Sequence, residues 1–343
     1  MNDRLRKVLA TAFACAILAV PAFAGTEERL GTGGAQESRI PVGARSVGLA
    51  YSNLSSVRGV EALFGNPAGL AQTDTHTEVL FSHAAYIADM DVNYLAFAQQ
   101  MGGFGSIGVN VKVLSVGDIF RTTEEAPDGT GDVFRPTFSS FGLSYARVLT
   151  DRATFGGTVR LISESVLQTH ATSVSFDFGF QYDTGVHGIR VGAAMQNFGP
   201  GAGFSGADFD RNLLIPEDDP QSANRTLSAS SSTAELPALF AGSITYPVLT
   251  GDARELRLHG TYQSNSFNVD EFRVGAELGL RKQFALRLGY KLTSNDSEIF
   301  GLTYGFGVAL PLGAETKLQL DYAGQTVSEF FDDVQHVGLT FKF

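Results

Sequence analysis

Charged side chains recur at alternate positions along the C-terminal half of this chain. In the stretches 269–281 and 284–293, charged residues alternate with apolar residues with a period of two. Because neighbouring side chains of a strand point to opposite faces, these charges would share one face. Such a row could select ions or bind a ligand, or it could pair internally and with the N-terminal segment, where Arg45 and Glu61 are the expected partners. Structural pairing is the favoured interpretation for the whole set, which comprises Arg257, Arg273, Glu277, Arg281, Arg287, Lys291, Glu255, Asp177 and Arg190.

No residue pattern indicates catalysis or a resident metal. The six histidines are scattered along the chain, and no two of them have metal-ligand spacing on one strand. The stretch 128–132 sets Asp128 and Asp132 around two glycines, which calcium could use. A solvated turn is the favoured interpretation of this stretch. The sequence therefore predicts no enzyme, no cofactor and no metal site.

The chain contains fourteen segments of strand length separated by turn residues. They are 76–86, 91–101, 104–115, 135–149, 152–164, 170–183, 187–198, 232–246, 252–264, 269–281, 284–293, 298–310, 313–325 and 333–343. The gaps after even segments are tight turns, whereas the two longest gaps, 116–134 and 199–231, follow odd segments. Short turns on one rim and long loops on the other are typical of an outer-membrane barrel.

Apolar side chains occupy one face of these segments, and the polar ones occupy the other. Phe272, Val274 and Leu278 would face lipid, while Arg273 and Glu277 would face an enclosed lumen. No apolar run in the mature chain is long enough for a spanning helix, and lipid leaves no partner for unpaired backbone groups. The predicted fold is all-β: a 14-stranded antiparallel transmembrane β-barrel.

Residues 1–24 have the features of a secretory signal peptide. Arg4, Arg6 and Lys7 precede an apolar run of 13 residues, and 22–24 reads Ala-Phe-Ala. Removal of three basic residues and one Asp would take the net charge from −11 to −13. A mature chain of this charge is an unlikely partner for nucleic acid. Cys15, the single cysteine, lies inside the signal peptide, so no disulfide is expected.

The last segment, 333–343, ends the chain on an aromatic residue. Val337, Leu339, Phe341 and Phe343 alternate with polar or small residues, including Gly338. This ending resembles the signal by which the barrel assembly machinery recognises outer-membrane proteins. Gly338, Phe341 and Phe343 are therefore the predicted assembly signal, and outer-membrane lipid is the predicted surrounding.

The stretch 25–75 is rich in small residues and lacks sustained alternation, so it is predicted to be a folded-in N-terminal segment. It contains Gly-Ala-Arg-x-x-Gly at 43–48 and Asn-Pro-Ala-Gly-Leu-Ala at 66–71. Asn66 and Pro67 suit the start of a helical turn. The two motifs, with Arg45 and Gly69, resemble the hatch of FadL-like barrels, specifically the PorV/PorQ family. That resemblance implies three parts: signal peptide 1–24, hatch 25–75 lodged in the lumen, and outer-membrane barrel 76–343.

The resemblance implies one of two functions. As a PorV/PorQ-like accessory component of type IX secretion, the barrel would dock a translocon and cargo at its loops. Apolar residues within the acidic loop 199–231 are candidate contacts: Phe204, Phe209, Leu213 and Leu214. As a FadL-like transporter, it would admit long-chain fatty acids or other hydrophobic molecules through an opening in the wall. The secretion role is the favoured hypothesis at this point, because the assigned lumen face is strongly charged.

Overall fold

The structure is a computed structural model that describes residues 29–73, 75–213, 225–295, 298–313, 316–328 and 330–343. The predicted signal peptide, 1–24, lies outside the described residues. Among the helices of these ranges, none is both long and apolar enough to cross a membrane.

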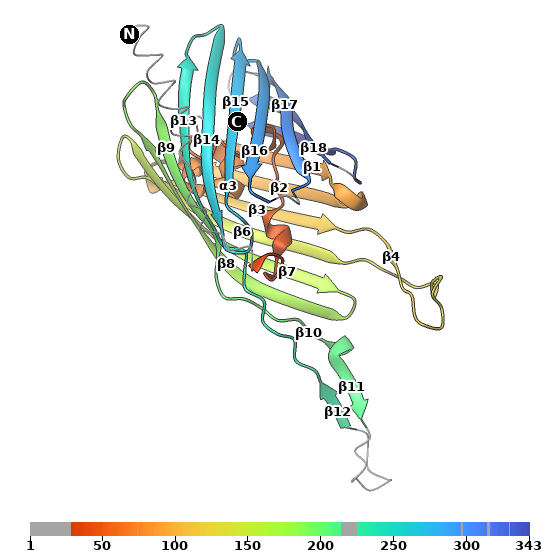
Figure 1. The fold of residues 1–343 in the computed structure, drawn as a ribbon. Coiled ribbons are helices and arrows are strands. Elements are labelled where there is room, and N and C mark those ends of the chain that lie inside the picture. Colours follow the sequence, from red (N-terminus) through yellow and green to blue (C-terminus); the bar gives the residue numbers. More distant parts are fainter. Residues whose placement is uncertain (1–28, 74, 214–224, 296–297, 314–315, 329) are drawn as a thin grey trace.

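The described residues form a closed antiparallel barrel of fourteen strands (Figure 1). Its wall consists of β1 Thr77–Ala85, β2 Asp91–Gln100, β3 Ser106–Ser115, β6 Thr137–Val148, β7 Ala153–Val166, β8 Thr169–Asp183, β9 Arg190–Phe198, β13 Leu239–Leu249, β14 Arg254–Asn265, β15 Glu271–Leu280, β16 Phe284–Thr293, β17 Phe300–Pro311, β18 Lys317–Val327 and β19 Val334–Lys342. Each strand pairs with its neighbours in sequence, and β19 closes the ring by pairing with β1. The predicted fold class is confirmed, since each wall strand falls on one of the fourteen predicted segments.

The two faces of the wall differ in chemistry, as the period of two requires. On β16, Leu286 and Leu288 point outward and are more than half exposed, whereas Arg287 points inward and is 4% exposed. On β8, outward Phe176, Phe178 and Phe180 alternate with inward residues that include buried Ser175 and Asp177. Exposed apolar side chains on one face of a closed sheet are expected where lipid surrounds it.

The two rims differ as predicted. The short-turn rim joins β2 to β3 through η6 (Gly102–Phe104) and β15 to β16 through residues 281–283. The opposite rim, called here the long-loop rim, carries η5 (Ile87–Asp89), the hairpin of β4 (Ile119–Phe120) with β5 (Val133–Phe134), and the insertion between β9 and β13. That insertion contains β10 (Ser205–Gly206), η7 (Ala207–Phe209), β11 (Asp210–Leu213) and β12 (Arg225–Ser228), and Figure 1 shows its hairpin away from the barrel.

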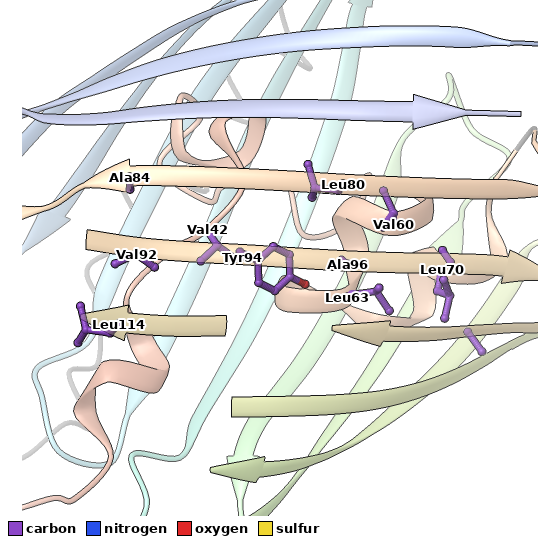
Figure 2. Close-up of a cluster of buried hydrophobic side chains, with 12 residues drawn as sticks. Val42, Val60, Leu63, Leu70, Leu80, Ala84, Val92, Tyr94, Ala96 and Leu114 are labelled. Atoms are coloured by element: carbon purple, nitrogen blue, oxygen red, sulfur yellow. The ribbon is translucent and has the colours of Figure 1, made fainter. Parts of the chain in front are cut away.

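The described part of the N-terminal segment, 29–73, occupies the lumen and is called the plug. It consists of short helices: η2 Gln36–Arg39, α2 Ala44–Val47, η3 Gly59–Glu61, α3 Ala62–Gly65 and η4 Pro67–Ala71. Figure 2 shows Val60, Leu63 and Leu70 of the plug beside Leu80 and Tyr94 of the wall, in one buried apolar cluster. The plug is thus packed against the inner wall of the barrel.

Glycines on the inner face of the wall allow this packing. A Cβ on Gly156 of β7 would lie 2.5 Å from the carbonyl carbon of Pro67, and one on Gly289 of β16 would meet the backbone of Leu49. Other wall glycines contact the plug in the same way: Gly108, Gly179, Gly192, Gly275 and Gly305. The close approach of plug backbone to wall backbone therefore depends on positions without a side chain.

We expect Gly156→Ala to destabilise the docked plug, because the new methyl group meets rigid backbone rather than a flexible side chain. Overpacking of this kind costs about 1–3 kcal/mol. Gly242→Ala on β13 is the matched control, since its Cβ would meet nothing within 4 Å. Denaturant unfolding in detergent, compared for the two variants, measures the difference. Equal stability of the two variants would show that the plug does not press on the wall at Gly156.

Candidate functional site

A buried carboxylate on the wall, Glu277 of β15, collects three guanidinium groups. Arg45 of the plug donates to it from Nε at 3.0 Å and from Nη2 at 3.1 Å. Arg287 of β16 donates from Nε at 2.8 Å, and Arg257 of β14 from Nη1 at 3.3 Å. Charge-assisted bonds of this type are stronger than neutral ones. Glu277 therefore ties the plug to three adjacent wall strands.

The network continues along the inner face of the wall to β18. Arg287 Nη1 lies 2.6 Å from Asp321 Oδ1, and Gln319 Nε2 donates to Asp321 at 2.6 Å. Arg45 also pairs with Glu61 of the plug at 3.3 Å. Both helices of the plug that carry these charges, α2 and η3, are thereby held in one electrostatic cluster.

Because Arg45 and Glu61 of the plug are buried close together, the pKa of each depends on the charge of the other. The carboxylate of Glu277, followed by that of Glu61, holds the pKa of Arg45 well above its usual value, against the effect of burial. Burial raises the pKa of Glu61, and the charge of Arg45 opposes that rise. Removing one member of such a cluster leaves the others buried without compensation.

The Asn-Pro motif docks the opposite side of the plug. The Asn66 side chain accepts from the Ala68 amide at 3.2 Å, which caps η4. Its Nδ2 donates to the Leu54 carbonyl at 2.9 Å and to the Phe180 carbonyl of β8 at 3.2 Å. Gly69 lies against the carbonyl of Val57. Asn66 thus acts both as a helix cap and as a bond between plug and wall.

Lys112 of β3 holds the beginning of the plug. Its Nζ donates to the carbonyls of Ile40 at 2.6 Å, Glu37 at 2.7 Å and Ser38 at 3.4 Å, so it satisfies the end of η2. The same ammonium lies 5.0 Å from the centre of the Phe64 ring. Burial, followed by the charge of Glu164, raises the pKa of Glu37 to about 7.

A cavity of about 290 Å³ separates the plug from the long-loop rim. Its apolar side is formed by Ile40, Tyr51, Leu54, Phe64, Leu239 and Phe300. Its polar side carries charges that lie in ion pairs: Arg39 and Arg273 share Glu271, at 3.5 and 2.7 Å, and Lys291 lies 2.7 Å from Glu298. The cavity can therefore hold a compact apolar molecule without leaving a charge unpaired.

The structure gathers most of the predicted lumen charges but not all of them. Arg257, Glu277 and Arg287 meet Arg45, whereas Arg273 and Lys291 line the cavity. The prediction for Arg281 is wrong: β15 ends at Leu280, and Arg281 lies exposed in the following turn with a φ of 51°. The alternation was extended one residue beyond the strand, past the point where the backbone leaves the extended conformation.

The loop candidates belong to the insertion between β9 and β13. Phe204 and Phe209 are half-buried, Leu213 is the last residue of β11, and Leu214 lies outside the described residues. Across the described ranges, no group of three or more His, Cys, Asp or Glu residues could hold a metal ion. Asp128 and Asp132 are therefore not part of such a group. Of the predicted assembly signal, Phe341 and Phe343 are exposed, and Gly338 faces Ala44 of the plug.

Comparison with known proteins identifies the fold. No protein-family model matches the chain. No curated protein matches it either. Among solved structures, CymD, described as a monoaromatic hydrocarbon channel, is similar with a TM-score of 0.57 and 12% identity over 89% of this chain and 98% of its own. The Ralstonia pickettii toluene transporter TbuX matches with a TM-score of 0.53 and 14% identity over 83% and 94% of the two chains.

A Pseudomonas aeruginosa FadL homologue is also similar, with a TM-score of 0.51 and 13% identity over 88% of this chain and 97% of that one. At these identities the likeness concerns the fold alone. The chain has the fold of the FadL-like barrels, which are transporters and channels in the structures named here, and a membrane barrel is the architecture they share with it.

Sequence reasoning missed the contacts that are made through backbone. The period of two places Lys112 on the inner face of β3, but its three acceptors are carbonyl groups, which leave no trace in residue type. The wall glycines alternate with outward apolar residues, as Gly156 does with Phe155, so their inward position could have been found from the same period of two.

We expect Arg45→Met to destabilise the seated plug by about 3–5 kcal/mol, because it leaves Glu61 buried without its guanidinium partner and removes the plug's bond to Glu277. Arg29→Met is the matched control: it breaks an exposed pair with Glu235 and should cost at most about 1 kcal/mol. Denaturant unfolding, together with trypsin cleavage inside the plug, measures both. Trypsin resistance of the Arg45 variant equal to that of the control would contradict the assignment.

We also expect a pH dependence from Glu37. Its pKa in the folded protein, about 7, lies above the usual 4.5, so the folded state binds this proton more tightly than the unfolded state does. The stability contributed by this group therefore falls as the pH rises from about 4.5 to about 7 and is constant above that. Glu37→Gln should flatten the plot of melting temperature against pH between about 4.5 and about 7. Glu124→Gln, in an exposed loop, should leave that plot unchanged. A slope that survives in Glu37→Gln would assign it to other groups.

Proposed function

We propose that this protein is an outer-membrane channel for small, uncharged hydrophobic molecules. The single observation that carries the proposal is the cavity between the plug and the long-loop rim, which combines an apolar side with charges that are already paired. The similar structures, among them a monoaromatic hydrocarbon channel and a toluene transporter, support the same class of substrate. In this proposal the long-loop rim faces outward and the short-turn rim faces the periplasm.

The size of the cavity favours compact substrates. An apolar cavity of about 150 Å³ is sufficient for benzene, and the volume here is about 290 Å³. Ligand sites in proteins typically span about 300–1,000 Å³, so this cavity is near the lower end. A monoaromatic hydrocarbon fits it better than a long-chain fatty acid, whose carboxylate would also have to compete with Glu271 and Glu298 for their basic partners.

The seated plug limits what can pass. Arg45, Asn66 and Lys112 fix it from three directions, so a porin-like flow of polar solutes through the lumen is not expected. An apolar molecule that reaches the cavity needs only a local displacement of the plug. We propose that such a displacement, and not removal of the plug, connects the cavity to the periplasm.

The type IX secretion role implied by the sequence resemblance receives no support from the comparisons. We therefore prefer the transporter function. We further propose that the ending of β19, with Phe341 and Phe343 exposed, is read by the barrel assembly machinery during insertion into the outer membrane.

We expect cells that carry this protein to take up radiolabelled toluene faster than cells without it. Ile40→Trp should abolish the gain, because the larger ring fills the apolar side of the cavity. Ile107→Trp, on the outward face of β3, is the matched control and should behave as the wild type. Radiolabelled oleate, tested in parallel, distinguishes the substrate classes. Toluene uptake that is the same with and without the protein would refute the proposal.

A further inference from the structure

A cavity of about 10 Å³ lies where the ring of strands closes. There β1 pairs with β19, the last strand of the wall, and this pairing is called here the closing seam. The plug contributes residues 42–46, Glu61 and Phe64 to the lining, and the wall contributes Leu80 of β1, Tyr94 of β2, Asp321 of β18, and Gly338 and Thr340 of β19. The cavity therefore lies between the plug and both sides of the closing seam.

Two buried hydroxyl groups belong to the lining of this cavity. Tyr94 is 2% exposed and Thr340 is 1% exposed, and neither hydroxyl has a hydrogen-bond partner among the described residues. Figure 2 shows Tyr94 within the buried apolar cluster of plug and wall. A buried hydroxyl without a partner is destabilising, and such groups are rare in folded proteins. Two of them in one cavity therefore point to a partner that is not part of the chain.

Two carboxylates complete the polar part of the lining. Glu61 accepts from Arg45 at 3.3 Å, and Asp321 accepts from Arg287 at 2.6 Å, so each carboxylate already has a basic partner. Because an ionised carboxylate has about four acceptor positions, both can accept a further hydrogen bond. An additional ion in the cavity would disturb these pairs. The lining therefore suits a small neutral molecule that both donates and accepts hydrogen bonds.

We propose that one water molecule occupies this cavity and bridges the plug to the closing seam. It accepts from the hydroxyls of Tyr94 and Thr340 and donates to the carboxylates of Glu61 and Asp321. Two donors and two acceptors are the complement of one water molecule. A buried water needs about 10–15 Å³, and the cavity of about 10 Å³ has no room for a larger ligand. The inference is independent of the proposed function.

The water completes a set of polar contacts between the plug and the closing seam. The amide of Gly43 donates to Ser82 of β1 at 3.2 Å, and Gln319 of β18 donates to Glu61 of the plug at 3.4 Å. Through Tyr94 and Thr340 the water adds β2 and β19. Hydrogen bonds then link the plug to all four strands around the closing seam. The water therefore stabilises the closed ring as well as the seated plug.

The first experiment removes one partner of the water. Thr340→Val replaces the hydroxyl with a methyl group of similar size and leaves the water one hydrogen bond short. The melting temperature of the purified protein in detergent should fall by about 2–4 °C. If no water were bound, the same change would remove a hydroxyl without a partner, and the melting temperature would rise or stay the same. Either of these results would overturn the inference.

Ser175→Ala on β8 is the matched control for this experiment. Ser175 is 0% exposed, and its hydroxyl also has no partner among the described residues, but it is not in the lining of this cavity. Its loss should not lower the melting temperature. A fall as large as that of Thr340→Val would also overturn the inference, because the effect would then not depend on the cavity.

The second experiment fills the cavity. A Cβ on Gly338 would lie 3.5 Å from the Cβ of Ala44 and 3.8 Å from the Cβ of Asp321, which is ordinary contact. Gly338→Ala therefore adds a methyl group to the lining without a clash and displaces the water. Its melting temperature should be lower than that of Gly242→Ala, whose Cβ would meet nothing within 4 Å. An equal or higher value would overturn the inference, because the methyl group would then have filled unoccupied space.

The third experiment identifies the occupant. A sodium ion is the alternative of similar size, so we compare the melting temperature in sodium chloride with that in choline chloride at equal concentration. Equal values are expected for a water, and a higher value in sodium chloride would overturn the inference. A high-resolution crystal structure should show one density peak within hydrogen-bond distance of the Tyr94 and Thr340 oxygens, absent in Gly338→Ala. The absence of that peak from the wild type would also overturn it.

Discussion

The rest of the structure depends on the bond between a plug guanidinium and a wall carboxylate, Arg45 with Glu277. Because Glu277 also accepts from Arg257 and Arg287, and Arg287 reaches Asp321, one carboxylate couples the plug to the stretch of wall from β14 to β18. Each of these charges would be costly if buried alone, so their mutual neutralisation is a condition for filling the barrel. The same network makes the lumen unsuitable for a wide polar channel, since nearly every charge in it is engaged.

The seated plug imposes requirements on the wall. Glycines at inward positions, such as Gly156 and Gly289, let the two backbones approach, and Lys112 satisfies the carbonyls where η2 ends. With the plug fixed, a cavity of about 290 Å³ remains on its long-loop side, next to Tyr51 and Phe64. A small cavity of paired charges and apolar side chains suits neutral molecules of modest size. The function proposed here follows from what the plug leaves open.

Much of the fold could be predicted from the sequence, because a period of two is imposed on every strand by the pleat and is visible in residue types. The fourteen strands, the two kinds of rim and the inward direction of Glu277 and Arg287 all follow from it. The end of β15 at Leu280 did not, since Arg281 continues the alternation although its backbone has turned. The lining of the cavity could not be predicted either: Phe300 occupies an outward position by alternation, and the register shift between β17 and β18 before Thr303 turns it to the cavity.

The central claim is that the plug stays seated and that the barrel is closed to polar solutes while it admits apolar ones. Ion conductance of the purified mature protein in a planar lipid bilayer, recorded at neutral pH, tests this claim most directly. The account predicts no sustained current through the wild-type barrel, because Arg45, Asn66 and Lys112 hold the plug across the lumen. A steady porin-like current through the unmodified protein would contradict it.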